Sequence, residues 1–186
     1  RKINFISRDD GYSPPKTKEQ YRKLVESEQV LLMFQSLGTP TNSAVHAYIN
    51  RQQVPHLFVS TGAAKWSQPQ QFPWTMGWQP NYQIEGRIYA RYLLENVPDA
   101  RIGILYQNDD YGKDYVKGLK DGLGAQAAEL IVAEESYEVT DPTISSQIIT
   151  LKNQGANVFY NVATPKFAAQ AIKKIAELDW QPVHLL

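Results

Sequence analysis

RIGILYQNDDYGKDYVKGLKDGLG, residues 101–124, is the stretch that decides the fold, because a strand pattern stands directly before a helix pattern. Residues 101–106 form a short apolar run of the kind found in buried strands. Residues 112–124 have the character of a helix, and Gly122 and Gly124 favour its end at that point. A strand followed by a helix is the repeating unit of parallel sheets, so the stretch predicts an α/β fold.

The same alternation extends in both directions along the chain. It predicts parallel sheets that are covered by helices on both faces. The expected strands, besides residues 101–106, are residues 2–8, 30–34, 54–60, 129–135, 157–163 and 183–186. The expected helices, besides residues 112–124, are residues 14–28, 42–50, 82–96, 145–154 and 166–178.

Apolar patterns also predict which sides of these elements are buried. The continuous apolar run Val30 to Phe34 predicts a strand that is covered on both faces. Two helices carry an apolar stripe that predicts their inner face. These stripes are Ile84, Ile88, Tyr92 and Leu93 in the first helix, and Phe167, Ala171, Ile172 and Ile175 in the second.

One region interrupts the alternation and indicates a boundary. Residues 62–81 are rich in Gln, Pro and Trp and show no clear periodicity. A loop of this length is usually functional or crosses between domains. We therefore expect two α/β lobes, residues 1–80 and residues 81–186, joined near residues 77–81. Because both ends of the chain fall inside strand patterns, we expect an internal portion of a longer protein.

Composition excludes several classes of function. Nineteen basic residues balance nineteen acidic ones, which argues against a general nucleic-acid binder. The absence of cysteine excludes thiolate catalysis, disulfides and cysteine-ligated metals. The three histidines have no metal-ligand spacing, and no nucleotide-binding or hydrolase motif is present. We expect no metal and no cofactor. No apolar run is long enough for a transmembrane helix, and we expect any export signal to lie outside this chain.

Polar residues gather in loops that follow strands, where parallel sheets bind ligands. Gln35 to Ser43 is rich in hydroxyl groups and glycine, and Thr41, Asn42 or Ser43 is the expected helix N-cap. Two interpretations are open for this loop: a cradle for a carboxylate at a helix N-terminus, or a well-capped helix and nothing more.

Two further loops follow the same rule. In Ser60 to Trp66, Gly62 and two alanines would let backbone amides approach a ligand, with Lys65 as a charge and Trp66 as an aromatic wall. The alternative is a glycine turn with an exposed lysine. In Tyr106 to Gly112, the pair Asp109 and Asp110 suggests catalysis or a divalent ion, but helix capping is the favoured interpretation. Trp74 and Trp78 favour a seal between lobes, whereas Trp66 is the better candidate for stacking on a ligand.

Three segments, residues 8–45, 54–63 and 101–124, resemble in this order the type I periplasmic solute-binding proteins of ABC importers, in the branch of the leucine/isoleucine/valine-binding proteins. This resemblance implies two α/β lobes that close on a small ligand. It also implies ligand contacts for two first-lobe loops and for two second-lobe residues. The candidate ligand-binding residues are Gly38, Thr39, Thr41, Gly62, Ala63, Ala64, Trp66, Tyr111 and Thr164, of which Trp66 comes from the loop pattern alone.

Three positions depart from the pattern of the branched-chain amino-acid binders. Ala64 stands where they have a hydroxyl residue, Gly38 where they have serine, and Ala163 where they have tyrosine. These departures favour a bulkier or aromatic carboxylate, an aliphatic amino acid held by Thr39 and Thr41, or a small amide.

The sequence therefore predicts a non-enzymatic, periplasmic solute-binding component of an ABC importer. Its expected partners are a small carboxylate or amino-acid ligand and, transiently, an ABC permease in the membrane. One alternative is the ligand-sensing domain of a receptor or regulator with the same fold. Another is an enzyme that uses Asp109 or Asp110.

Overall fold

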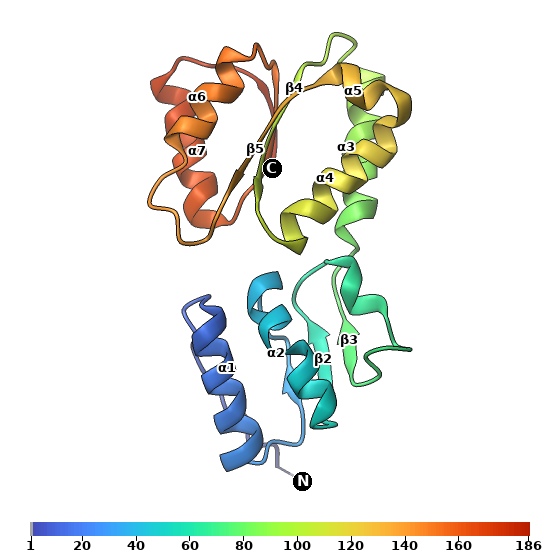
Figure 1. The fold of residues 1–186 in the computed structure, drawn as a ribbon, viewed down its shortest axis with the longest axis vertical. Helices are drawn as coiled ribbons and strands as arrows, with labels where there is room; N and C mark the ends of the chain where they lie inside the picture. The colour runs from blue at the N-terminus through green and yellow to red at the C-terminus, as the bar shows by residue number, and fades with distance from the viewer. Residues whose placement is uncertain (1) are drawn as a thin grey trace. The chain divides into compact units, whose positions relative to one another are not determined.

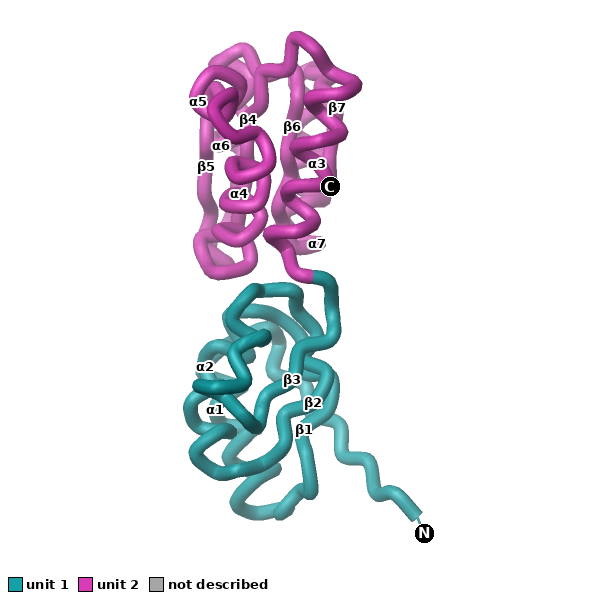
Figure 2. The backbone as a smooth tube through the Cα atoms, turned by 90° about the vertical axis from the view of Figure 1, so that its right-hand side faces the viewer, with its two compact units in different colours: residues 1–80 teal, residues 81–186 magenta. Residues whose placement is uncertain are grey.

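A computed structural model describes residues 2–186, which form two compact units, residues 2–80 and residues 81–186 (Figure 2). We call them unit 1 and unit 2. Within residues 2–186, no helix combines the length and the apolar character that crossing a bilayer requires.

Unit 1 is built on a parallel sheet with the strand order β1-β2-β3. Helix α1 (Pro14–Arg22), extended by a π-helical turn over Lys23–Ser27, packs with helix α2 (Thr39–Arg51) over one face of this sheet (Figure 1). The strands are β1 (Met33–Phe34), β2 (His56–Val59) and β3 (Thr75–Gly77), and a short 3-10 turn, η2 (Ala64–Ser67), lies between the last two. The core of this unit is Tyr21, Leu24, Met33, Val45 and Ile49.

Unit 2 is built on a parallel sheet with the strand order β5-β4-β6-β7. Helices α3 (Tyr82–Asn96) and α4 (Asp110–Leu123) cover one face, and α6 (Ser145–Asn153) and α7 (Pro165–Glu177) cover the other (Figure 1). The strands are β4 (Ile102–Gln107), β5 (Ile131–Tyr137), β6 (Val158–Val162) and β7 (Val183–Leu185), and a 3-10 turn (Gly124–Gln126) and α5 (Ala127–Leu130) precede β5.

Alternate side chains of the central strands supply the two cores of unit 2. Ile104 points into the core under α3 and α4, whereas Leu105 points into the core under α6 and α7. Trp180 lies in the second of these cores, where its Nε1 donates to the carbonyl of Ala156 at 3.0 Å. The predicted α/β class, with parallel sheets flanked by helices, is therefore confirmed.

Two predictions for unit 1 are wrong. Residues 2–8 form no strand, and the side chains of Ile3 and Phe5 are 94% and 75% exposed. Alternation alone does not make a strand, because each strand also needs a neighbouring edge with which to pair. The expected strand over residues 30–34 shrinks to Met33–Phe34, and Leu31 is 84% exposed. It is not covered on both faces, because Met33 is buried in the core beneath α1 and α2 whereas Phe34 is 50% exposed.

The predicted inner faces of two helices in unit 2 are also partly wrong. Helix α3 has the expected bounds, but Ile84, Ile88 and Tyr92 of its apolar stripe are 46–63% exposed, and only Leu93 is buried. The residues that face inward are Gly86, Ala90 and Leu93. At Gly86 the backbone of α4 approaches so closely that a Cβ would lie 2.7 Å from it. In α7, Phe167 and Ala171 are buried as expected, whereas Ile172 is 48% exposed.

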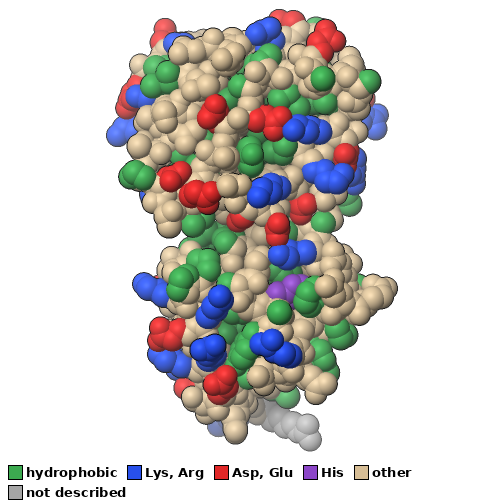
Figure 3. Space-filling view, in the orientation of Figure 1, with side chains coloured by type: hydrophobic (Ala, Val, Ile, Leu, Met, Phe, Trp, Pro, Cys, Tyr) green, Lys and Arg blue, Asp and Glu red, His purple; other side chains and the backbone are tan. Residues whose placement is uncertain are grey.

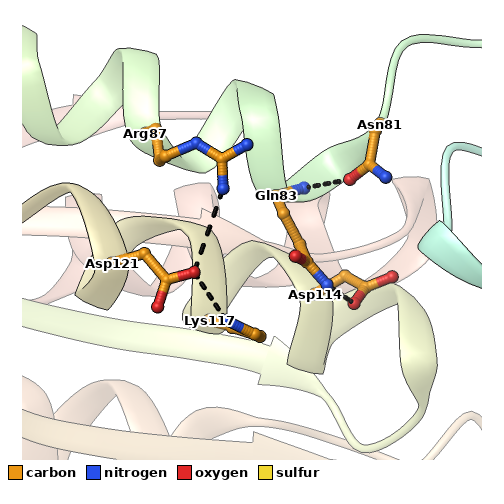
Figure 4. Close-up of polar contacts among 6 residues, drawn as sticks. All are labelled: Asn81, Gln83, Arg87, Asp114, Lys117 and Asp121. Atoms are coloured by element: carbon orange, nitrogen blue, oxygen red, sulfur yellow. Dashed lines mark hydrogen bonds and ion pairs between the residues drawn. The ribbon is translucent and has the colours of Figure 1, made fainter.

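Polar contacts at one end of α3 reinforce its packing on α4 (Figure 4). Asn81 caps α3, because its side-chain oxygen accepts from the amide of Gln83 at 2.8 Å. The Gln83 side chain in turn donates to Asp114 of α4 at 2.7 Å. Further along α4, Asp121 pairs with Lys117 at 2.6 Å and with Arg87 of α3 at 3.9 Å.

Candidate ligand-binding loops

The loops that follow β1 and β2 lie side by side at the carboxyl edge of the unit 1 sheet. Leu37 and Ser60 form an isolated parallel bridge. The amide of Ser60 donates to the carbonyl of Ser36 at 2.9 Å, and the amide of Gly38 donates to the carbonyl of Ser60 at 3.3 Å. The structure therefore brings together two of the three loops that the sequence predicts as ligand-binding.

A pair of threonine hydroxyls joins these two loops. Thr39 Oγ1 and Thr61 Oγ1 lie 2.5 Å apart, and both residues are at most 2% exposed. One hydroxyl must donate to the other, which leaves the second hydroxyl hydrogen for another acceptor. Thr61 was not predicted as a site residue. Its position directly after a strand and before Gly62 is the only sequence signal for it.

The N-terminus of α2 differs from the expectation. The N-cap residue is Gly38, with a φ of 94°, and not Thr41, Asn42 or Ser43. The Thr41 hydroxyl donates to the carbonyl of Leu37 and, at 3.0 Å, to that of Gly38. The Asn42 side chain donates to the carbonyl of Gly38 at 2.6 Å. These side chains therefore brace the loop, and the hydroxyl hydrogen of Thr41 is already used by backbone oxygens.

A buried polar network anchors the same loop to the core of unit 1. Tyr21 Oη contacts Ser36 Oγ and lies 3.0 Å from His56 Nε2. The Asn42 side chain donates to the carbonyl of Ser36 at 2.9 Å. Burial, with a smaller effect from the charge of His46, lowers the pKa of His56 to about 3. Burial raises the pKa of Tyr21 well above its ordinary value, so both groups are neutral at pH 7.

The loop that follows β2 also contacts α2. Gly62 and Ala63 are buried, and Ala64 begins η2. Lys65 Nζ donates to Ser43 Oγ of α2 at 3.0 Å, so this lysine is not the freely exposed one that a simple glycine turn would carry.

Trp66 lies inside unit 1. It is 3% exposed, its ring contacts the ring of His46 edge-on at 4.9 Å, and a Cβ on Gly77 would lie 3.1 Å from its Cβ. These contacts explain its burial by packing, and they lend no support to stacking on a ligand. That role stays a prediction. By contrast, Trp74 and Trp78 are 37% and 63% exposed.

In unit 2, Asp109 caps α4, as predicted. Its Oδ1 accepts from the amides of Tyr111 at 2.9 Å and Gly112 at 3.3 Å, and its Oδ2 accepts from the Gln107 side chain at 2.7 Å. Burial raises the pKa of this carboxyl despite these bonds. Both oxygens are engaged, which speaks against a catalytic role. Among residues 2–186, no group of three or more His, Cys, Asp or Glu side chains is arranged to hold a metal ion.

Tyr137 connects two loops at the carboxyl edge of the unit 2 sheet. Its hydroxyl accepts from the amide of Thr164 at 2.9 Å and lies 3.3 Å from Gln107 Oε1. Tyr137 is 1% exposed and was not predicted, because nothing in its local sequence distinguishes it from a core tyrosine. Thr164 precedes α7 as its N-cap residue but makes no side-chain cap bond.

Tyr111, at the start of α4, belongs to an aromatic cluster in unit 2. Its ring lies 5.3 Å from that of Tyr82 and 5.5 Å from that of Tyr115, edge-on in both cases. The structure thus places the predicted residues in two sets. Unit 1 holds Gly38, Thr39, Thr41, Gly62, Ala63, Ala64 and Trp66, and unit 2 holds Tyr111 and Thr164.

Basic and acidic side chains are interspersed over the face shown in Figure 3.

Comparison with known proteins adds a family profile and a set of solved structures. The profile, described as a periplasmic binding protein, matches residues 1–186. No curated protein matches the sequence significantly.

The solved structures share the fold at low sequence identity. One is an extracellular ligand-binding receptor from Rhodopseudomonas palustris HaA2, with 20% identity, a TM-score of 0.85, and coverage of 98% of this chain and 50% of that one. Another is a possible leucine/isoleucine/valine-binding protein from Rhodopirellula baltica SH 1, with 20% identity, a TM-score of 0.78, and coverage of 95% and 48%. A third is a solute binding protein of an ABC transporter from Rhodopseudomonas palustris BisB5 in complex with 3,4-dihydroxy benzoic acid, with 17% identity, a TM-score of 0.81, and coverage of 96% and 48%. The chain spans about half the length of the solved structures that it matches.

Proposed function

Because the chain belongs to the type I periplasmic binding protein family, we propose that it is the solute-binding component of an ABC importer and takes a small carboxylate-bearing ligand. In this proposal unit 1 is part of the first lobe and unit 2 is most of the second lobe. The protein works in the periplasm, binds without catalysis, and delivers its ligand to a membrane permease.

The meeting of two loops in unit 1 is the observation that carries the proposal. Thr39 and Thr61 place two hydroxyls at the carboxyl edge of the sheet, where parallel α/β proteins bind ligands. Thr39 is also the first residue of α2, whose N-cap glycine offers no side chain to accept from the amides of Thr39 and Thr41, while Pro40 between them has no amide hydrogen. Amides at a helix N-terminus and a spare hydroxyl hydrogen are the donors that a carboxylate needs.

The binding free energy expected of such a site is in the range that a transport receptor needs. Hydrogen bonds to a charged group contribute about 1.5–3 kcal/mol each. Two or three of them, together with an apolar contact, reach the roughly −8 kcal/mol that corresponds to micromolar affinity.

Unit 2 contributes Tyr111 and Thr164 in this proposal. Both stand where a strand passes into a helix, at the start of α4 and before α7. Gln107, Asp109 and Tyr137 hold these two helix starts in place, so their role is to position rather than to touch the ligand.

We propose an aliphatic or aromatic amino acid, or an aromatic acid, as the ligand. The small residues Ala64 and Ala163 leave more room than the hydroxyl and aromatic residues of the branched-chain amino-acid binders. The relative from strain BisB5 with 3,4-dihydroxy benzoic acid supports an aromatic acid as one option for the family.

The test measures the binding of carboxylates to the full chain. The measurement is then repeated on a variant that lacks one of the two hydroxyls. Native mass spectrometry of protein purified from cells identifies a retained small molecule, and calorimetry measures its affinity. We expect Thr39→Val to weaken binding at least tenfold, because a hydroxyl at the joint of the two loops is lost. Thr39→Ser keeps the hydroxyl and should stay within threefold of the wild type.

Thr150→Val is the matched control. The Thr150 hydroxyl donates to the carbonyl of Ser146 within α6, so its loss should leave affinity unchanged. Melting temperatures show whether each variant is folded. Failure of every carboxylate to bind the wild type, or equal affinities for wild type and folded Thr39→Val, would contradict the proposal.

A further inference from the structure

Tyr12 lies in a turn before α1 that side-chain hydrogen bonds hold in one conformation. Asp9 Oδ1 accepts from the amide of Gly11 at 2.8 Å. Asp10 accepts from the amide of Tyr12 at 2.9 Å with one oxygen and from the hydroxyl of Thr17 at 2.6 Å with the other. Because Thr17 is a buried residue of α1, this last bond ties the turn to the body of unit 1.

The backbone of Tyr12 adopts an unfavourable conformation for a bulky residue. Its φ is 57°, in the left-handed region that glycine and asparagine occupy more readily. Tyr12 is only half-buried and is not among the core residues of unit 1.

The ring of Tyr12 rests on Gly38. A Cβ on Gly38 would lie 2.3 Å from Tyr12 Cε2 and 3.2 Å from Tyr12 Cδ2, so no larger residue fits beneath the ring as it stands. Gly38 immediately precedes Thr39, whose hydroxyl meets that of Thr61. The ring therefore borders the loop that we propose as the carboxylate site.

We infer that Tyr12 determines ligand specificity by lining this site and selecting carboxylates with a planar aromatic body. The inference rests on the proposed function. Asp9 and Asp10 stand in the same turn, and their charge disfavours a second anionic group beside the ring. The ring itself favours the flat or edge-on contacts of another ring. The carboxylate is then held at Thr39 and Thr61, and the body of the ligand lies against Tyr12.

The test compares 4-hydroxybenzoate and L-phenylalanine with L-leucine as probes, by calorimetry on the full chain. We expect the wild type to bind at least one aromatic probe tenfold more tightly than leucine. Tyr12→Leu should remove this preference, weakening the aromatic probe at least tenfold and leucine less than threefold. Tyr12→Phe keeps the ring and should keep the preference.

Tyr12→Asn separates ligand contact from folding. Asparagine adopts a positive φ with little strain, so the melting temperature should stay equal or rise while the aromatic preference is lost. A preference for leucine in the wild type, or an unchanged aromatic affinity in Tyr12→Leu or Tyr12→Asn, overturns the inference and leaves the proposed function standing. Equal weakening of all probes shows that Tyr12 only positions the loop, and also overturns it. If no carboxylate binds the wild type, the proposed function fails and the inference fails with it.

Discussion

His56 is fully buried beneath the loop that follows β1, within hydrogen-bond distance of the hydroxyls of Tyr21 and Ser36. Its pKa of about 3 means that the folded chain keeps this imidazole neutral, whereas the unfolded chain takes up a proton below about pH 6.5. The unfolded state then binds more protons, so the free energy of unfolding falls as the pH decreases from about 6.5 towards 3.

We predict that acid weakens the fold through this residue, by about 2 kcal/mol between pH 7 and pH 5. Replacing His56 by glutamine keeps a polar side chain but removes the titration, so the dependence of stability on pH should become shallower. Urea unfolding at a series of pH values measures this. His184→Gln, in the partly buried edge strand β7, is the control and should change the slope less. An unchanged slope in His56→Gln would show that another group is responsible.

At the residue scale, the cap of α4 was predictable from the local sequence, whereas the cap of α2 and the distant contacts were not. Asp109 was correctly interpreted as a helix cap, because the amides that it accepts from lie two and three residues along the chain. The partnership of Thr39 with Thr61 spans 22 residues, and that of Tyr21 with His56 spans 35. No local pattern reports such pairs, because they depend on which strands the fold sets side by side.

At the scale of elements, α3 and α4 pack closely through three glycines. A Cβ on Gly86 would lie 2.7 Å from the backbone of α4, and a Cβ on Gly118 would lie 2.3 Å from the carbonyl oxygen of Gln83. A Cβ on Gly122 would meet the Cβ of Ala90 at 2.5 Å. Glycine is required at these positions by the neighbouring helix and not by its own backbone angles.

We predict that Gly118→Ala destabilises unit 2. Alanine at an exposed helix position usually stabilises relative to glycine by up to about 1 kcal/mol. Here the added methyl group collides with backbone atoms, and overpacking costs about 1–3 kcal/mol. Denaturant unfolding measures the difference. Lys117→Ala, on the exposed side of the same helix, loses only a surface ion pair and should cost less than about 1 kcal/mol. A more stable Gly118→Ala variant would mean that the helices can move apart freely.

The same glycines explain why element bounds were easier to predict than element faces. The bounds of α3 agree with the prediction at both ends, because periodicity and the cap at Asn81 are local signals. The inner face was misassigned, because a stripe of large apolar residues is normally the buried one. The three residues of β3 were missed for a different reason: so short a strand shows no periodicity.

At the scale of the whole molecule, the two units differ in how well they cover their sheets. Unit 2 has a core on each face of its sheet. In unit 1, Met33 points into the core, whereas Phe34, its neighbour along β1, points away and is 50% exposed. The rings of Phe34, Phe58 and Trp78 contact one another edge-on in a row, and Trp78 is 63% exposed.

We predict that residues 81–186 fold cooperatively when expressed alone, and that residues 1–80 are only marginally stable. Small domains bury a smaller share of their surface, and parallel sheets usually need cover on both faces. Circular dichroism melts of the two pieces test this, with 8-anilinonaphthalene-1-sulfonate fluorescence as a probe for exposed apolar surface. We expect the dye to respond more strongly to residues 1–80. Equal melting temperatures and equal dye responses would contradict the prediction.

The distribution of tryptophan has a practical consequence for spectroscopy. Trp66 is 3% exposed in unit 1, and Trp180 is 9% exposed in unit 2, so each unit contains one shielded indole. Two variants would each keep a single tryptophan, Trp66 in one and Trp180 in the other. The emission wavelength of each variant would then report on one unit of the molecule. Stopped-flow traces of the two would then reveal whether the units lose structure in one event or in succession.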